Sequence, residues 1–219
     1  MKLQGEYSVS VPYDQRIARI LVRPLAHSFV TPNHITALVL ALSLGAGGLF
    51  ASGDPAAANL AAFMFVLARF LDHFDGELAR LNGTASRFGY YFDYASGALG
   101  FAALFTGMGI GLSTGPLGQW AYIFGFCGAA AAIICLFLNL ARDRREIAAE
   151  QADNRDADSV GYPALGGFEL EDGIYLLAPI TWMGWSAPFL VAAGIGAMVY
   201  FGWTLWKLRS AGAKKRGGL

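Results

Sequence analysis

Long runs without a charged residue dominate the chain. No Asp, Glu, Lys or Arg occurs in residues 94–141 or in residues 173–206, and one membrane crossing takes about 20 apolar residues. A Gly- and Pro-containing break divides each run in two, and two further apolar segments come earlier in the chain. The pattern predicts an all-α polytopic membrane bundle of six transmembrane helices. These helices are expected at residues 35–51, 56–80, 89–111, 119–141, 172–184 and 187–207.

An amphipathic stretch precedes the first predicted span. Within residues 14–26, Ile17, Ile20 and Leu21 share one helical face, while arginines share another. This is the pattern of a helix lying in the headgroup plane of a membrane. We therefore expect three regions: a cytoplasmic N-terminal segment with this interfacial helix at 1–34, a six-helix transmembrane domain at 35–207, and a basic cytoplasmic tail at 208–219.

Composition and charge point to the same class of protein. Hydrophobic residues make up 55% of the chain and charged residues 15%, whereas soluble domains average about 25% charged residues. All 16 Lys and Arg residues fall on one predicted side of the membrane, and the opposite turns carry only Asp54. The positive-inside rule then places both termini in the cytoplasm and the protein in the cell (inner) membrane. Disordered chains and nucleic-acid-binding domains are excluded as classes.

Acidic residues gather at the inner end of the second predicted helix. Asp72 and Asp75 share a face of that helix, and Asp93 begins the next helix, which runs antiparallel to it. Carboxylates at membrane depth usually mark function, and three that converge would repel each other unless a hard divalent cation joined them. Alternatively, the acids are structural and pair with nearby arginines. The arginines within reach are Arg69, Arg80 and Arg87.

The segment Asp72-x2-Asp75-Gly76-x2-Ala79-Arg80-x8-Gly89-x3-Asp93 resembles the signature of the CDP-alcohol phosphatidyltransferase family. The Pro32-Asn33-x2-Thr36 entry to the first span and the number of spans resemble that family too. The resemblance implies transfer of a phosphatidyl or substituted phosphate group from a CDP-linked donor, such as CDP-diacylglycerol, to a hydroxyl acceptor. CMP is released, and the reaction serves phospholipid biosynthesis. The enzyme is expected to be a homodimer in contact with membrane lipids, and no nucleic acid is expected as a partner.

The resemblance also implies roles for individual residues. It makes residues 35–207 the catalytic domain, with a site that faces the cytoplasm and holds Mg²⁺ or Mn²⁺, expected as two ions. The implied metal ligands are Asp72, Asp75 and Asp93, of which Asp93 is also a catalytic candidate. The implied residues of the CDP pocket are Gly76, Ala79, Arg80 and Gly89, with Asn33 and Thr36 as further candidates.

The sequence departs from the family signature at Gly97, where the family has a fourth Asp that is its proposed general base. Three interpretations stay open: another residue replaces this base; the acceptor is acidic enough or carries its own base, and Gly97 enlarges its pocket; or the chain binds a nucleotide-lipid without turnover. A small membrane transporter is a further alternative, because six spans with intramembrane charges suit that class as well. The candidate bases are His73 and Asp172, followed by Glu77, Tyr94, Ser96, Glu169 and Glu171.

Overall fold

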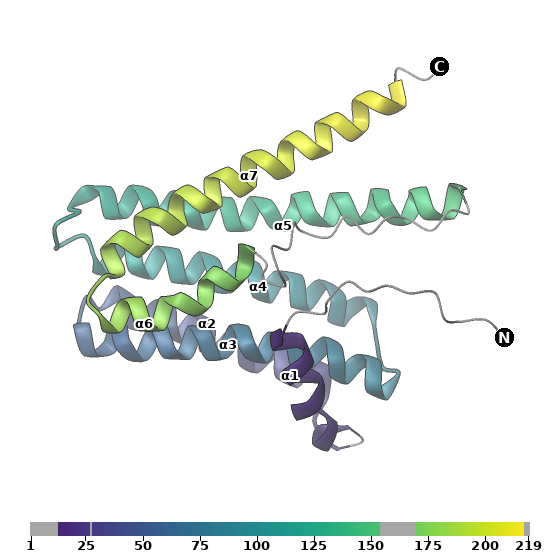
Figure 1. Ribbon diagram of the computed structural model, residues 1–219, viewed down its shortest axis with the longest axis horizontal. Helices are drawn as coiled ribbons and strands as arrows, with labels where there is room; N and C mark the ends of the chain where they lie inside the picture. The colour runs from purple at the N-terminus through teal and green to yellow at the C-terminus, as the bar shows by residue number, and fades with distance from the viewer. Residues whose placement is uncertain (1–12, 27, 154–169, 217–219) are drawn as a thin grey trace.

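Helices account for all the regular structure that the computed structural model describes, which covers residues 13–26, 28–153 and 170–216 (Figure 1). No strand occurs in these residues. In chain order the elements are α1 (Tyr13–Leu21), η1 (Arg23–Leu25), α2 (Pro32–Ala51), α3 (Pro55–Asn82), α4 (Arg87–Gly111), α5 (Gln119–Asp153), η2 (Leu170–Leu176), α6 (Leu177–Trp182) and α7 (Ser186–Arg216).

Side-chain caps fix where the helices around the acidic segment begin and end. The Thr31 side chain accepts a hydrogen bond from a backbone N–H in the first turn of α2, and Asp54 and Ser86 do the same for α3 and α4. Gly83 ends α3 with a φ of 64°, a left-handed conformation that glycine adopts without strain. The short turn at 83–86 therefore reverses the chain, and α4 returns antiparallel to α3.

Within the described residues, five helices are long and apolar enough to cross a membrane: α2, α3, α4, residues 119–144 of α5 and residues 186–206 of α7. They confirm the predicted polytopic helical membrane bundle. The predicted span at 172–184 differs, because the apolar helix there is confined to Gly173–Trp182. Those ten residues rise about 15 Å, roughly half of the hydrocarbon thickness. Helix α5 also continues past the predicted residue 141 to Asp153.

Glycines let the long helices approach closely. A Cβ on Gly107 of α4 would overlap the backbone oxygen of Gly47 on α2, and a Cβ on Gly125 of α5 would lie 2.7 Å from the Cα of Gly109 on α4. Small residues at helix crossings are the usual way for membrane helices to gain packing contacts. Helix α4 is therefore fixed between α2 and α5, and the position of Asp93 is fixed with it.

Helix α1 lies across the long helices rather than along them, against the C-terminal part of α3 (Figure 1). Ala18 and Val22 are fully buried in a cluster with Phe74 and Leu78 of α3. On the other side of α1, Ile20 is 64% exposed, as a residue facing lipid would be. A helix with an exposed apolar residue therefore occurs where the interfacial element is predicted, beside the acidic segment of α3, and its place in the headgroup plane stays a prediction.

Candidate active site

The antiparallel α3 and α4 bring the predicted acidic residues to the same end of the bundle. Asp72 and Asp75 stand near the C-terminal end of α3, and Asp93 stands near the N-terminal end of α4. Asp93 is within electrostatic reach of both α3 aspartates and of Arg69. The two helices thus collect three acidic groups and one basic group where the sequence pattern predicted a convergence of acids.

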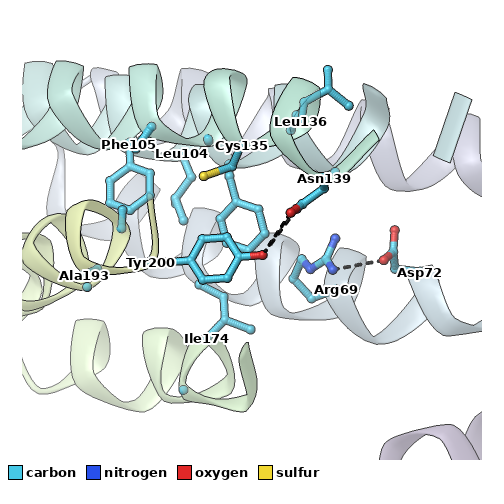
Figure 2. Close-up of a pocket in the computed structure, with 18 of the residues that line it drawn as sticks. Arg69, Asp72, Leu104, Phe105, Cys135, Leu136, Asn139, Ile174, Ala193 and Tyr200 are labelled. Atoms are coloured by element: carbon cyan, nitrogen blue, oxygen red, sulfur yellow. Dashed lines mark hydrogen bonds and ion pairs between the residues drawn. The ribbon is translucent and has the colours of Figure 1, made fainter. Parts of the chain in front are cut away.

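A cavity of about 650 Å³ opens beside two of these acids. Arg69, Asp72, Asp93 and Gly97 line its charged mouth, and the rest of its wall is mainly apolar and comes from α4, α5, α7 and η2 (Figure 2). On α4 the lining continues from Asp93 to Met108, a rise of about 22 Å. The cavity therefore joins a polar end at the acids to a deep apolar end within the bundle.

Two polar side chains face each other inside this cavity. Tyr200 of α7 and Asn139 of α5 lie 3.3 Å apart between the tyrosine oxygen and the amide nitrogen. Figure 2 shows them between the apolar residues Phe105 and Ile174 on one side and Arg69 on the other. The pair gives the apolar part of the cavity one polar contact point, next to the charged mouth.

Asp75 is held by hydrogen bonds on both carboxylate oxygens. The Thr36 hydroxyl donates to Oδ2 at 2.5 Å, and the Gly76 backbone N–H donates to Oδ1 at 2.6 Å. Asp75 is 6% exposed and Thr36 is 2% exposed. In this arrangement Asp75 does not line the cavity, and its oxygens are engaged by α2 and by its own backbone.

Asp72 and Asp93 are the acids whose oxygens suit a cation. Asp72 Oδ2 lies 3.0 Å from Arg69, but the buried Oδ1 has no hydrogen-bond partner among the described residues. An unsatisfied buried carboxylate oxygen beside a second carboxylate is a hard donor set of the kind Mg²⁺ and Mn²⁺ prefer. The described residues contain no group of three acidic, His or Cys side chains already arranged around an ion. The site therefore suits a divalent cation held by the two carboxylates of Asp72 and Asp93. Asp75 becomes a third ligand only when its hydrogen bond with Thr36 breaks.

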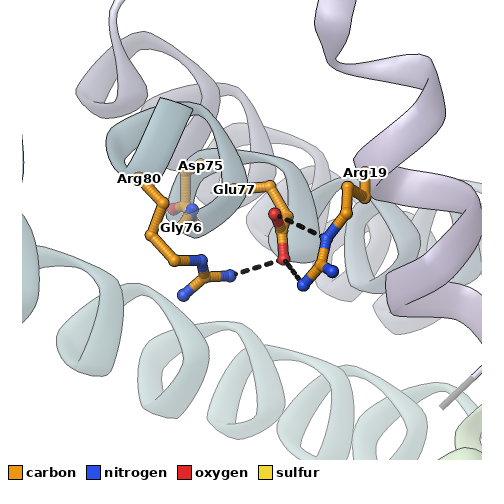
Figure 3. Close-up of polar contacts among 5 residues, drawn as sticks. All are labelled: Arg19, Asp75, Gly76, Glu77 and Arg80. Atoms are coloured by element: carbon orange, nitrogen blue, oxygen red, sulfur yellow. Dashed lines mark hydrogen bonds and ion pairs between the residues drawn. The ribbon is translucent and has the colours of Figure 1, made fainter. Parts of the chain in front are cut away.

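Two of the predicted nucleotide-binding residues of α3, Gly76 and Arg80, lie next to Glu77 (Figure 3). Arg80 donates to Glu77 Oε1 at 2.8 Å, and Arg19 of α1 donates to both Glu77 oxygens at 3.3 Å. The Arg80 guanidinium nitrogens also lie 3.6 Å from the position of a Cβ on Gly76, which is ordinary contact, so the guanidinium lies directly beside this glycine. Glu77 therefore holds two arginines in place and is not positioned as a base.

The other predicted nucleotide residues lie outside the cavity lining as well. Asn33 Oδ1 lies 3.2 Å from the position of a Cβ on Gly89, so this glycine lets the start of α4 approach the start of α2. Ala79 is partly buried on α3, and Thr36 is the partner of Asp75. The structure thus brings these residues together in pairs around the acidic segment rather than into the 650 Å³ cavity.

The remaining candidate bases on the described chain already have hydrogen-bond partners. His73 Nε2 lies 3.4 Å from the Tyr175 hydroxyl, and Ser96 donates to the backbone oxygen of Thr36. Tyr94 lines the cavity but donates to Asp143 at 2.5 Å. These contacts leave Asp93, which lines the cavity with Gly97, as the carboxylate that makes no hydrogen bond within the described residues.

Three further candidates precede α6. Glu169 lies outside the described residues, and the side chains of Glu171 and Asp172 do too, although their backbone is part of η2. Gly173, the next residue along the chain, lines the cavity. The role of Asp172 as a base therefore stays a prediction.

Sequence reasoning did not single out Arg69 and Asp143 as parts of the site. Arg69 lies three residues before Asp72, a spacing at which side chains on a helix meet, so its pairing was readable as one alternative. Asp143 accepts hydrogen bonds from Tyr90 and Tyr94 of α4, and no local pattern in the sequence signals those long-range contacts.

Comparisons with known proteins place this fold. A family model described as CDP-alcohol phosphatidyltransferase matches residues 29–206. The crystal structure of Mycobacterium tuberculosis phosphatidylinositol phosphate synthase with CDP-DAG bound covers 87% of this chain and 94% of that chain, at a TM-score of 0.53 and 19% identity. The same synthase in complex with manganese and citrate gives a TM-score of 0.43 at 20% identity, over 88% of each chain. No curated protein matches the sequence.

Proposed function

The chain belongs to the CDP-alcohol phosphatidyltransferase family, and we propose that it transfers a phosphatidyl or substituted phosphate group from a CDP-linked donor to a hydroxyl acceptor in phospholipid synthesis. We take CDP-diacylglycerol as the donor. The observation that carries this proposal is the placement of Asp72 and Asp93, from two antiparallel helices, at the mouth of a cavity of about 650 Å³ with an apolar interior. A lipid-linked nucleotide has the matching division into a charged and an apolar part.

The reaction replaces one phosphorus–oxygen bond with another. The acceptor oxygen bonds to the phosphorus that carries the lipid, the bond from that phosphorus to the bridging pyrophosphate oxygen breaks, and CMP leaves with that oxygen. The hydroxyl proton passes to a base, for which Asp93 is our first candidate because it faces the cavity beside Gly97. Asp172 is the second candidate, on the strength of its neighbour Gly173 in the cavity wall.

The chain's own residues divide the remaining tasks. Arg80, held by Glu77, presents a guanidinium next to Gly76, and a guanidinium suits phosphate oxygens. Asp72 and Asp93 would hold Mg²⁺ or Mn²⁺, with Asp75 as the third ligand after it parts from Thr36. When bound, the metal supplies charge neutralisation for the pyrophosphate and the leaving CMP. The two-ion prediction needs ligands for both ions, and Arg69 competes for one of them.

We further propose that the protein is a homodimer in the cell (inner) membrane with its site facing the cytoplasm. The ends of α3, α5 and α7 that carry the basic residues lie at the same end of the bundle as α1 (Figure 1). The positive-inside rule assigns that end to the cytoplasm. The homodimer rests on the family resemblance.

A second function is favoured by one specific contact. The ion pair between Arg69 and Asp72, at 3.0 Å, together with glycine at position 97 suits a member of the family that binds a nucleotide-lipid without turnover. Family membership favours either of these over a small transporter.

The test is CMP release by the purified protein in lipid nanodiscs with CDP-diacylglycerol, Mn²⁺ and a panel of alcohol acceptors. We expect turnover with at least one acceptor and its loss in Asp93→Asn. The matched control is Asp54→Asn at the opposite end of α3, where Asp54 is an N-cap and Asn caps equally well. Donor binding without CMP from any acceptor would favour the non-catalytic function, and full activity in Asp93→Asn would remove Asp93 from the mechanism.

A further inference from the structure

Arg69 is the basic residue at the cavity mouth, and within the described part of the chain no other Lys, Arg or His lines the cavity. Its Nη2 lies 3.0 Å from Asp72 Oδ2, and the two side chains are 14% and 15% exposed. Its guanidinium also lies over the Phe101 ring, 5.1 Å from the ring centroid. An arginine at membrane depth is costly unless it is paired. These two contacts therefore fix the guanidinium at the mouth (Figure 2).

The guanidinium faces Gly97 across the gap between α3 and α4. A Cβ on Gly97 would have Arg69 Nη1 as its nearest neighbour, at 3.9 Å, which is ordinary contact. Any side chain at position 97 would therefore start toward Arg69. At the position on α4 where the family signature has a carboxylate, this chain has a glycine. The positively charged guanidinium of Arg69 reaches toward the same place from α3.

The charges at the mouth, together with Asp75, which lies within electrostatic reach of Asp93 without lining the cavity, set the number of divalent cations that they balance. Asp72, Asp75 and Asp93 together with Arg69 carry a net charge of −2. One divalent cation neutralises this charge, whereas two would leave a positive excess in a partly buried, largely apolar site, where uncompensated charge is costly. Arg69 also occupies Asp72 Oδ2, so that Oδ1 is the oxygen left without a partner.

We propose that Arg69 is a positioning residue that fixes Asp72 and stands in for a second metal ion, so that one chain binds a single Mg²⁺ or Mn²⁺ between Asp72 and Asp93. The inference rests on the proposed function, because it takes the aspartates to be metal ligands. It replaces the expectation of two ions. The Nη1 atom that faces Gly97 also offers an N–H donor to a phosphate oxygen of the donor substrate, for which the planar guanidinium is suited.

The test is a titration of the purified protein with Mn²⁺, without nucleotide, in which electron paramagnetic resonance measures the free ion. We expect one tightly bound Mn²⁺ per wild-type chain. Arg69→Met removes the charge, keeps most of the length and releases Asp72 Oδ2, so Mn²⁺ binding should tighten about tenfold or more. Arg209→Met is the matched control, because Arg209 is exposed on α7 beyond its apolar span, and it should bind Mn²⁺ as the wild type does.

A second pair of variants tests the charge count. In Gly97→Asp the new carboxylate faces Arg69 and pairs with it, so we expect one Mn²⁺ per chain still. In the double variant Arg69→Met/Gly97→Asp that pairing is lost, and the site gains one carboxylate and loses one guanidinium, so its net charge is two units more negative than in the wild type and we expect two Mn²⁺ per chain. Arg69→Lys keeps the charge and should keep one ion.

Each result decides the proposal. Two ions in the wild type, or the same Mn²⁺ affinity in Arg69→Met and wild type, would overturn the role of Arg69 while leaving the proposed transferase intact. Absence of Mn²⁺ binding in the wild type would overturn the metal assignment of the proposed function as well. If Arg69→Met fails to fold, as judged by gel filtration, Gly97→Asp decides alone, and two ions in that variant would refute the pairing.

Discussion

The hydrogen bond between Thr36 and Asp75 joins α2 to the acidic segment of α3, and Thr36→Val tests it directly. The Thr36 hydroxyl lies 2.5 Å from Asp75 Oδ2, in surroundings where the two residues are 2% and 6% exposed. Valine keeps the shape of threonine and removes the donor. Asp75 then keeps one donor, the Gly76 N–H at 2.6 Å, and one of its buried carboxylate oxygens is left without a partner.

The size of the effect follows from that burial. Hydrogen bonds to charged groups contribute about 1.5–3 kcal/mol, and a buried group left unsatisfied is costly. We therefore expect Thr36→Val to lower the free energy of unfolding by about 2 kcal/mol without metal. For a chain of this size the melting temperature should fall by about 4–8 °C. Thr84→Val is the control, because Thr84 lies exposed in the turn after α3.

The assay is thermal unfolding in detergent micelles, with and without Mn²⁺. Since the substitution frees Asp75 Oδ2 for a cation, Mn²⁺ should raise the melting temperature of Thr36→Val more than that of the wild type. A variant that melts at the wild-type temperature without metal would refute the reasoning about the hydrogen bond. A destabilised variant that gains no more from Mn²⁺ than the wild type does would refute Asp75 as a latent ligand.

Two further predictions concern glycines with matched neighbours on the same helix or helix pair. Gly107→Ala should destabilise the protein by about 1–3 kcal/mol, because its Cβ would overlap the backbone of Gly47. The control Gly48→Ala meets nothing within 4 Å and should not destabilise the protein. Thermal unfolding compares the two variants, and equal melting temperatures would contradict the close packing of α2 and α4. Gly196→Leu should fill the cavity and lower CMP release about tenfold or more, whereas Gly202→Leu, equally open but outside the cavity lining, should not; equal rates in the two variants would place the substrate elsewhere.

The transmembrane helices were predictable because a bilayer leaves the chain few choices. Backbone groups in hydrocarbon must be paired within the segment, so an apolar run of sufficient length is a helix. The cap residues Thr31, Asp54 and Ser86 then extend the predicted helices by a few residues at their starts. Hydropathy alone does not measure depth, however. Residues 172–184 are apolar like a span, but the apolar helix that the structure describes there, Gly173–Trp182, is shorter than the five long helices.

The site was predictable only as far as backbone spacing decides it. The helical spacing and the turn at Gly83 bring Asp72 and Asp93 to one end of the bundle. Contacts with other helices then decide the rest. The i,i+3 spacing of Arg69 and Asp72 favours their pairing, but Asp75 turns to Thr36 of α2 and Arg69 is held over Phe101 of α4. The contacts with Thr36 and Phe101 do not follow from the sequence around the acids.

The central claim is that carboxylates of α3 and α4 hold a divalent cation at the mouth of the cavity, where the pyrophosphate of the donor binds. The most direct measurement is anomalous X-ray scattering from crystals grown with Mn²⁺ and CDP-diacylglycerol. The account predicts a manganese peak between Asp72 and Asp93, in contact with a phosphate oxygen. A manganese peak away from both aspartates, or a bound donor with no metal beside them, would contradict it.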